Sequence, residues 1–364
     1  MEFSEIKFVY DKFNVAAPLC TAEPYGCGII NHTFLLVDEK GTRYILQEVN
    51  TTVFKKPVEL MENMVGVTEF LKKKIVLAGG DASRETLTVL YAKDGKPYYI
   101  DEKGRFWRMT HFVEGTVSYQ SVEKKGLLYS AARSFGNFQC LLADYPAETL
   151  HETIPNFHNT AKRYEAFEEA LHADVANRAS EIEEDIAVLR KYADRASIIV
   201  DKLASGEIPT RVTHNDTKLN NILMDEKTDE GVCVIDLDTV MPGSLLYDFG
   251  DSIRFAGNNS TEDNKDLSLV WLRTELYEEY VSGFLAGVGE SITSEEIKLL
   301  PMSVFILTYE LALRFMTDYL NGDVYFKLKY EGHNLVRARA QIKLMLDIDE
   351  KLEALEAITE KYTK

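Results

Sequence analysis

The chain has 364 residues, and its 59 Asp and Glu residues outnumber its 41 Lys and Arg residues, which gives a formal charge of −18. With 45% hydrophobic and 27% charged residues, its composition is that of a globular protein and excludes disordered and fibrous classes. A strongly acidic surface repels phosphate backbones and anionic lipids, so we expect neither nucleic acid nor a membrane as a partner. The length favours two domains or two lobes.

The cysteines are few for a chain of this size and include no C-x-x-C pair; they are Cys20, Cys27, Cys140 and Cys233. We therefore expect unpaired thiols in a reducing compartment. Residues 1–13 carry mixed charges and lack the apolar segment of a secretory signal. Because no uninterrupted run of about 18 apolar residues occurs, we expect no membrane-spanning segment. These features predict a cytoplasmic protein.

The first hundred residues predict a small antiparallel sheet with one helix. Two β-prone segments, residues 33–37 and 42–49, flank the turn at residues 39–41 and predict a hairpin. Pro57 begins a segment whose apolar residues recur every three to four positions as far as Leu71, which predicts a helix. Turn signals then separate three further predicted strands, at residues 87–91, 98–101 and 105–112.

Beyond Gly115 the pattern becomes mainly helical, at residues 126–142, 164–203 and from 267 to the C-terminus. A short β-rich segment, residues 210–238, interrupts the helices and carries most of the polar residues that suggest chemistry. The sequence therefore predicts an α+β protein with two lobes. The expected N-terminal lobe covers residues 1–112 and binds nucleotide, and the expected C-terminal lobe covers residues 113–364.

Carboxylates stand at the ends of two predicted strands in the β-rich segment. The pattern His-x-Asp-x-x-x-x-Asn occurs at His214, Asp216 and Asn221, and Asp236 follows the apolar strand 232–235. A carboxylate that leaves a buried strand is costly to place unless it is paired or binds a metal. Each motif alone also fits a polar turn or a helix cap. Their occurrence together, in this order and after an antiparallel lobe, favours a functional site.

Phosphoryl transfer from ATP needs this set of residues. One carboxylate orients the acceptor hydroxyl, while a second carboxylate and an amide oxygen hold Mg²⁺ against the phosphates. Protein kinases show the same spacing of five between the catalytic Asp and the metal-binding Asn. We therefore assign Asp216 as the catalytic base, Asn221 and Asp236 as Mg²⁺ ligands and His214 as an orienting residue.

Two N-terminal segments are candidates for nucleotide contact. Residues 25–31 contain Gly26 and Gly28, and glycines let a backbone approach phosphate oxygens, although an ordinary hairpin turn also fits this pattern. Residues 107–115 join the two lobes, where adenine would pack among apolar side chains and bind the backbone; a buried edge strand is the alternative. The nucleotide-binding residues expected from both segments are Gly26, Gly28, Asn31, His111 and Val113.

Longer strings in the sequence resemble a known family. The motif of Asp216 and Asn221 resembles that of the aminoglycoside phosphotransferase and choline kinase superfamily. The longer strings resemble one group of sugar kinases inside it; they are residues 211–255, with 213–225 and 241–244 inside them, and residues 333–337. Within that superfamily the chain is similar to the N-acetylhexosamine 1-kinases. This resemblance implies a protein-kinase-like fold. It also implies the transfer of phosphate from ATP to the anomeric hydroxyl of N-acetylglucosamine or N-acetylgalactosamine, giving ADP and the sugar 1-phosphate.

The resemblance also assigns roles to single residues. A Lys or Arg of the superfamily usually meets the phosphates from the strand after the first hairpin turn, and Gln47 stands there in this chain, so Gln47 is expected among the nucleotide-binding residues. Lys218 is expected either to neutralise the transferring phosphate in catalysis or to be an exposed lysine. Arg314 and Tyr325 are implied as sugar ligands together with Asp216, while an Arg on an apolar helix can also pair with a carboxylate structurally.

Several alternatives stay open at this point. The same fold could act on an aminoglycoside, choline or homoserine, and a nucleotide-binding module without catalysis is a third possibility. Asp248 and Asp251 are expected to brace the catalytic loop, whereas His158 and Arg163 have no assigned role. We expect a monomer or a weak dimer.

Overall fold

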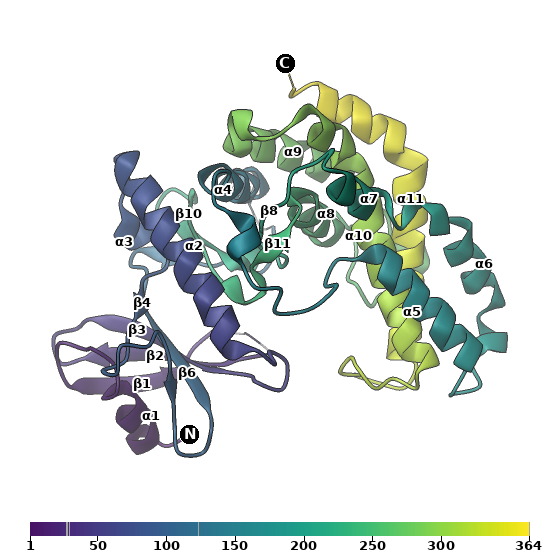
Figure 1. Cartoon of the computed structure of the whole chain (residues 1–364). Helices are drawn as coiled ribbons and strands as arrows, with labels where there is room; N and C mark the ends of the chain where they lie inside the picture. Colours follow the sequence, from purple (N-terminus) through teal and green to yellow (C-terminus); the bar gives the residue numbers. More distant parts are fainter. Residues whose placement is uncertain (27, 29, 123, 364) are drawn as a thin grey trace.

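The computed structural model describes residues 1–26, 28, 30–122 and 124–363, and it has two lobes (Figure 1). A small antiparallel sheet with a short helix forms the N-terminal lobe, and a larger bundle of helices forms the C-terminal lobe. The long helix α2, Pro57–Leu77, lies between them. The α+β architecture predicted from the sequence is confirmed.

The N-terminal lobe contains a six-stranded antiparallel sheet in the order β1-β2-β3-β6-β4, with β5 also paired to β6. The predicted hairpin is confirmed, because β2 pairs with β3 and Leu36 lies opposite Tyr44. The strands have the following bounds: β1 Leu19–Pro24, β2 His32–Asp38, β3 Arg43–Val49, β4 Val89–Leu90, β5 Tyr99–Ile100 and β6 Phe106–His111.

The two faces of this sheet have different roles because side chains alternate along a strand. One face is apolar and packs against α1, Phe3–Tyr10, through residues that include Leu36, Leu46 and Trp107. The opposite face carries Gln47 and Arg108 and is turned toward α2 and the C-terminal lobe. Polar side chains of the sheet are therefore presented to the neighbouring lobe.

A buried apolar cluster connects the two lobes. It joins side chains of α2, such as Met61 and Met64, to Val212, Cys233 and Leu237 around the β-rich segment of the C-terminal lobe. Burying apolar surface of this kind is worth about 25 cal/mol per Å². Helix α2 therefore packs at the same time against its own sheet and against the strands that carry the predicted catalytic residues.

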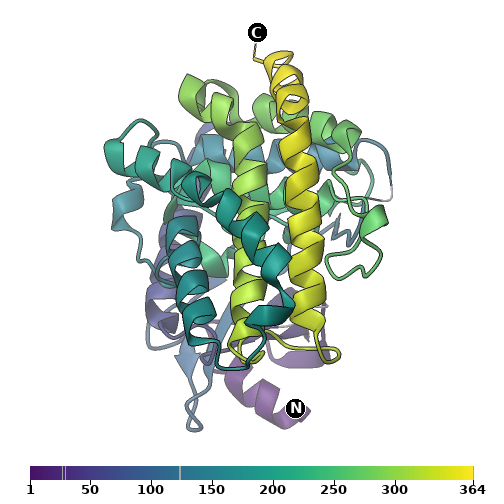
Figure 2. The same cartoon turned by 90° about the vertical axis from the view of Figure 1, so that its right-hand side faces the viewer.

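The C-terminal lobe is built from helices around short strands. The region predicted as helical at residues 164–203 consists of three helices separated by turns. Helices α10 and α11 lie side by side (Figure 2). The helices are α3 Ala82–Glu85, which belongs to the N-terminal lobe, and α4 Leu127–Leu141, α5 Thr160–Ala173, α6 Glu183–Lys191, α7 Ile198–Ser205, α8 Leu245–Ala256, α9 Thr274–Val288, α10 Ser294–Leu320 and α11 His333–Glu360.

Short strands position the β-rich segment inside this lobe. β7, Thr116–Val117, pairs with β9, Ile222–Asp225, which pairs with β10, Gly231–Val234. A second small sheet joins β8, Arg211–Thr213, to β11, Met241–Gly243. The proposed boundary at residues 112 and 113 falls between β6 and β7 and stays a prediction.

Helix α10 qualifies the expectation about membranes. By length and composition it is apolar enough to cross a bilayer. Charged residues interrupt its apolar runs, so it contains no uninterrupted apolar run of about 18 residues. In the structure, 78% of its most apolar window is buried inside the C-terminal lobe. It is the central helix of that lobe, packed against α8, α5 and α11.

The segment between α8 and α9 is tied to the start of α11 by charged pairs. Glu262 accepts from Arg254 at 3.0 Å and from Arg337 at 2.7 Å. Asp263 pairs with Lys329 at 2.6 Å and contacts the His333 ring at 3.2 Å. The hydrogen bond from Lys329 lowers the pKa of Asp263 to about 2, and burial opposes that shift.

Asp263→Asn should lower stability at neutral pH and not in strong acid. A carboxyl group with a depressed pKa contributes stability above its unfolded pKa of about 3.9, and this contribution is lost as pH falls toward the folded pKa. Because Lys329 is mostly exposed, solvent screening limits the expected loss at pH 7 to about 1 kcal/mol. Urea unfolding from pH 7 to pH 3 measures it.

The matched control is Asp11→Asn, which removes an exposed pair with Lys7 on α1 and should change stability little. A difference between wild type and Asp263→Asn that stays constant from pH 7 to pH 3 would contradict the role given to this carboxylate.

Candidate active site

The loop that follows β8 is held by one buried carboxylate. Asp248, on α8, accepts the backbone N–H of His214 at 3.0 Å and that of Asn215 at 2.7 Å. It also accepts Nε2 of Gln139, on α4, at 2.7 Å. Burial raises the pKa of Asp248, and these hydrogen bonds oppose the shift. The geometry is that of the brace expected behind the catalytic loop.

His214 connects this loop to the loop that carries Asp236. Its Nε2 lies 2.9 Å from the carbonyl oxygen of Ile235, and its Nδ1 lies 3.2 Å from the backbone N–H of Asp216. A carbonyl can only accept and a backbone N–H can only donate, so these bonds require the neutral ring with its proton on Nε2. His214 is fully buried, so it orients Asp216 without reaching a substrate.

Asp216 points its carboxylate out of the loop. One carboxylate oxygen pairs with Lys218 Nζ at 2.6 Å, and the other accepts Asn221 Nδ2 at 3.2 Å. The Asp216 side chain is 27% exposed, which leaves acceptor positions open for a hydroxyl group. Burial opposes the charge of Lys218, but Asp216 and Asp251 more than offset this effect and raise its pKa. Lys218 therefore stays positively charged beside the base.

Asp236 has the environment of a metal ligand. It follows β10 in a left-handed conformation, with φ +60°, and among the described residues its exposed carboxylate has no hydrogen bond or ion pair. Desolvation by the protein groups around it and the charges of Asp238 and Asp216 raise its pKa. An unpaired carboxylate that its neighbours repel favours binding of a cation.

Asn221 completes the donor set for Mg²⁺. Its Nδ2 donates to the backbone oxygen of Asp216 at 2.7 Å, which leaves its Oδ1 without a donor among the described residues. Carboxylate and amide oxygens suit Mg²⁺, which proteins hold through one or two carboxylates together with substrate phosphates. The described part of the chain contains no group of three or more His, Cys, Asp or Glu residues placed for a metal. Asn221 and Asp236 therefore fit a magnesium site that substrate completes.

The polar face of the N-terminal sheet meets this loop through Arg108 and Asp238, which the sequence did not single out. Arg108, on β6, forms an ion pair with Asp238 and donates from Nε to Gln47 Oε1 at 2.9 Å. Asp238 also accepts Asn31 Nδ2 at 2.7 Å. No local pattern marks Arg108, because the pairing of two strands decides what it faces. The Asp-x-Asp spacing of Asp236 and Asp238 was a visible signal.

The amide groups of two expected nucleotide-binding residues are engaged by the protein. Gln47 Nε2 donates to Thr33 Oγ1 at 3.1 Å, and Asn31 Oδ1 accepts the backbone N–H of Asn50 at 3.0 Å. Gly26 has φ +74°, a conformation that favours glycine, whereas Gly28 has open space beside it. Binding of phosphate by this turn stays a prediction, and its backbone is the part suited to it.

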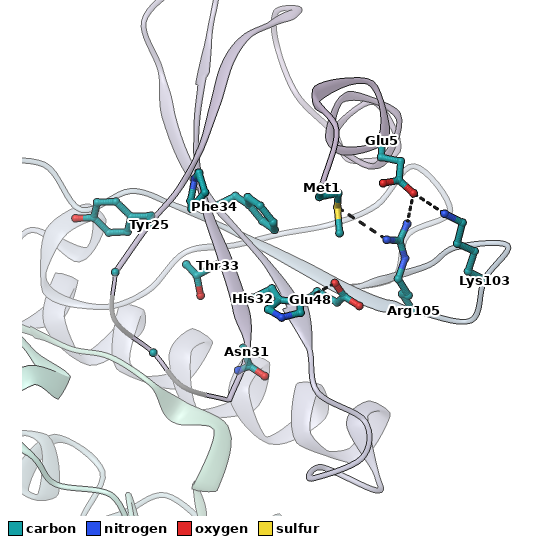
Figure 3. Close-up of a pocket in the computed structure, with 13 residues that line it drawn as sticks. Met1, Glu5, Tyr25, Asn31, His32, Thr33, Phe34, Glu48, Lys103 and Arg105 are labelled. Atoms are coloured by element: carbon teal, nitrogen blue, oxygen red, sulfur yellow. Dashed lines mark hydrogen bonds and ion pairs between the residues drawn. The ribbon is translucent and has the colours of Figure 1, made fainter. Parts of the chain in front are cut away.

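A cavity of about 670 Å³ lies beside this turn, on the face of the sheet near α1 (Figure 3). Its charged groups already pair with one another: Glu5 binds Lys103 at 2.5 Å and Arg105 at 3.4 Å, and His32 lies 3.2 Å from Glu48. It offers no free cation for phosphates among the described residues. Figure 3 shows Asn31 at the end of the turn nearest the C-terminal lobe.

The segment that joins the lobes, residues 107–115, was expected to contact adenine, and its backbone is better placed for this than its side chains. The ring of His111 packs beside Tyr44, with centroids 5.2 Å apart, on the face turned toward α1, and burial lowers its pKa. Its side chain therefore points away from Gln47. The Val113 carbonyl accepts Thr116 Oγ1 at 2.8 Å, while the Val113 N–H has no partner within the described residues. That N–H is the group suited to adenine.

The predicted sugar ligands lie at the far end of α10 and in the loop after it. The guanidinium of Arg314 lies between the rings of Phe157 and Phe326, 5.8 and 5.6 Å from their centroids, and has no hydrogen bond or ion pair with the described residues. Tyr325 is 73% exposed. Asp318 shapes the loop by accepting backbone N–H groups of Val324, Tyr325 and Phe326 at 2.8–2.9 Å.

A buried polar cluster lies beside Arg314. Glu310 accepts His158 Nδ1 at 2.9 Å and Thr160 Oγ1 at 2.8 Å, while Nε2 of His158 and Nε of Arg163 are buried without partners. Burial and the neighbouring charge of Arg314 lower the pKa of Arg163. The structure thus places His158 and Arg163 near Arg314, a proximity that the sequence did not indicate.

Comparison with known proteins identifies the family. Residues 21–284, well over half of the chain, match the phosphotransferase enzyme family. A spectinomycin phosphotransferase solved with ADP and spectinomycin is similar at 12% identity and a TM-score of 0.59, over 97% of this chain and 99% of that one. An aminopropanol kinase associated with a microcompartment has 15% identity and a TM-score of 0.59, over 98% and 99%.

An amicoumacin kinase solved with AMP-PNP, Ca²⁺ and Ami gives 15% identity and a TM-score of 0.57, over 96% of this chain and 94% of that one. The chain belongs to the phosphotransferase enzyme family, and the protein-kinase-like fold expected from the sequence is confirmed. It is a small-molecule kinase with an alcohol group as acceptor.

Asp216→Asn should remove turnover and leave nucleotide binding intact. The amide cannot accept the proton of a hydroxyl group, and loss of a general base typically costs about 10²–10⁴-fold in rate. Steady-state kinetics and calorimetric titration with ADP and Mg²⁺ measure the two effects. Asp229→Asn, in the nearby turn where the carboxylate pairs with Lys124, is the control and should leave kcat unchanged. Normal kcat in Asp216→Asn would exclude it as the base.

Proposed function

We propose that this protein is an ATP-dependent kinase that phosphorylates the anomeric C1 hydroxyl of N-acetylhexosamines, giving ADP and the sugar 1-phosphate. The observation that carries the sugar assignment is Arg314, whose N–H donors find no partner among the described residues although two aromatic rings flank it. The resemblance of the long sequence strings to sugar kinases supports the same acceptor. Both N-acetylglucosamine and N-acetylgalactosamine are included.

The chemistry begins at Asp216. Its open carboxylate accepts a hydrogen bond from the C1 hydroxyl and orients that oxygen toward the γ-phosphorus of ATP. As the new P–O bond forms and the bond to the β-phosphate oxygen breaks, the hydroxyl proton passes to Asp216. Lys218, 2.6 Å from Asp216, keeps a positive charge beside the reacting groups. When bound, Mg²⁺ neutralises the phosphate charges, and Asn221 and Asp236 are its ligands.

The nucleotide is proposed to lie against the polar face of the sheet. Its adenine would meet the free Val113 N–H, and the turn around Gly26 would approach the phosphates through its backbone. This placement uses the groups that the protein leaves unsatisfied rather than the cavity near α1, where the charged groups already pair.

The groups around Arg314 favour a neutral acceptor that is rich in oxygen. Guanidinium donors fit hydroxyl groups and an acetamido carbonyl, and the exposed ring of Tyr325 offers an apolar face. Arg163 and Arg314 lie close enough for the charge of one to lower the pKa of the other. A cationic acceptor such as an aminoglycoside or choline would face both guanidiniums, so this observation disfavours that alternative.

The cellular location, the oligomeric state and the kind of partner are proposals that rest on the sequence. We place the enzyme in the cytoplasm, as a monomer or weak dimer that works on small molecules. A nucleotide-binding module without catalysis is disfavoured because the residues expected to carry out the transfer, Asp216, Asn221 and Asp236, are all present.

Phosphorus NMR tests the reaction directly. Protein incubated with ATP, Mg²⁺ and N-acetylglucosamine, and then with N-acetylgalactosamine, should give a sugar 1-phosphate signal together with ADP. Choline, homoserine and an aminoglycoside serve as competing acceptors under the same conditions. ADP formed only with one of those acceptors would remove the sugar assignment and keep the kinase.

Arg314→Gln should weaken sugar binding selectively. Loss of charged hydrogen bonds to the acceptor is expected to raise KM for the sugar about 10–100-fold. KM for ATP should stay near the wild-type value, because the contacts of Arg314, with Phe157, Phe326 and Arg163, include no expected nucleotide or metal ligand. The matched control is Arg190→Gln, on α6, which removes a surface pair with Glu168 and should change neither KM. An unchanged sugar KM in Arg314→Gln would remove this residue from the acceptor site.

A further inference from the structure

The strand β3 lacks the cation that the resemblance led us to expect, and its neighbour strand has one. In the antiparallel pairing of β3 with β6, Gln47 lies directly opposite Arg108. Directly opposed residues in such a pair point to the same face of the sheet. The positive charge that position 47 lacks is therefore present on the neighbouring strand. The Cα atoms of directly opposed residues in such a pair are about 5 Å apart.

Contacts on both sides orient this arginine. Its Nε donates to Gln47 Oε1 at 2.9 Å, and the Gln47 amide is itself fixed by its bond to Thr33 Oγ1 at 3.1 Å. Arg108 is only 2% exposed. A neutral glutamine at this position thus has a specific use, because it accepts from the guanidinium instead of repelling it.

The partner of Arg108 belongs to the loop of the metal ligands. Asp238 lies two residues after Asp236, is 4% exposed, and forms the ion pair with Arg108. Its second oxygen accepts Asn31 Nδ2 at 2.7 Å, from the end of the turn that precedes β2. One carboxylate therefore ties together the sheet, the glycine-containing turn and the loop of Asp236.

The electrostatics of phosphoryl transfer give this arrangement a reason. Asp216, Asp236 and Asp238 place several negative charges where anionic phosphates must also bind. Kinases offset such charge with a strand lysine that meets the phosphates. A buried Arg is always protonated and presents several fixed donors, so it supplies the same charge from the adjacent strand.

We propose that Arg108, oriented by Gln47, is the positioning residue of the nucleotide phosphate site, supplying the positive charge expected on β3 and holding the Asp236 loop through Asp238. This inference rests on the proposed function for the presence of nucleotide phosphates at this face. It does not depend on which acceptor the enzyme uses, so its test uses binding of ADP with Mg²⁺.

The decisive experiment moves the charge back to β3. In Arg108→Gln, calorimetric titration should show affinity for ADP and Mg²⁺ lowered about 10–100-fold, with thermal stability also reduced because Asp238 is left unpaired. The double variant Gln47→Lys with Arg108→Gln moves the positive charge from β6 to β3 and leaves a glutamine on β6. It should recover most of the lost nucleotide affinity. Affinity no better than that of Arg108→Gln, in a double variant of restored stability, would overturn the proposal.

A second variant separates charge from structure. Arg108→Met with Asp238→Asn removes both charges together, and replacing both members of a buried pair often preserves stability. We expect a folded protein with weak nucleotide binding and a raised KM for ATP. Wild-type nucleotide affinity in this variant would show that the pair is only structural and would overturn the proposal.

The control is Arg105→Gln, which removes an ion pair with Asp101 just before β6, on the side of the lobe near α1. It should leave nucleotide affinity unchanged. A wild-type protein that binds ADP and Mg²⁺ but phosphorylates no sugar would overturn the proposed function alone. A wild-type protein that binds no ADP would overturn both.

Discussion

The catalytic loop keeps its shape because the buried carboxylate of Asp248 collects N–H donors from two directions. Two donors come from the loop backbone, at His214 and Asn215, and one comes from Gln139 on α4. A buried carboxylate is costly without such donors, so the loop, α4 and α8 hold one another in place. Asn215 adopts a left-handed backbone conformation, with φ +67°, in this loop. The turn that results sends the Asp216 carboxylate outward.

A second carboxylate has the corresponding role between the lobes. Asp238 receives Arg108 from the sheet and Asn31 from the turn, directly after the loop of Asp236. The apolar cluster around α2 holds the same two lobes together without directional bonds. Hydrophobic contact therefore holds the lobes together, and the ion pair of Arg108 with Asp238 adds a directional contact between them.

Local patterns were sufficient for the elements and for the central residues. The β2–β3 hairpin follows from alternation around a turn, and α2 follows from apolar spacing after Pro57. The motif spacing placed Asp216 and Asn221 within one short loop, where they do contact each other. Patterns failed where distant segments meet. No local pattern showed that the His111 ring packs beside Tyr44 or that α10 is mostly buried inside its lobe. The expected contact of His111 with nucleotide stays a prediction.

The sequence by itself determined the α+β class, the order of the lobes and the identity of the residues able to do chemistry, because these depend on periodicity and on spacing within short segments. The tertiary structure decided which polar groups face one another across strands and helices. Arg108 lies opposite Gln47 through strand register, and Arg163 lies beside Arg314 through the packing of α5 on α10. Such contacts join residues far apart in the chain, and only burial of the whole apolar core fixes their distances.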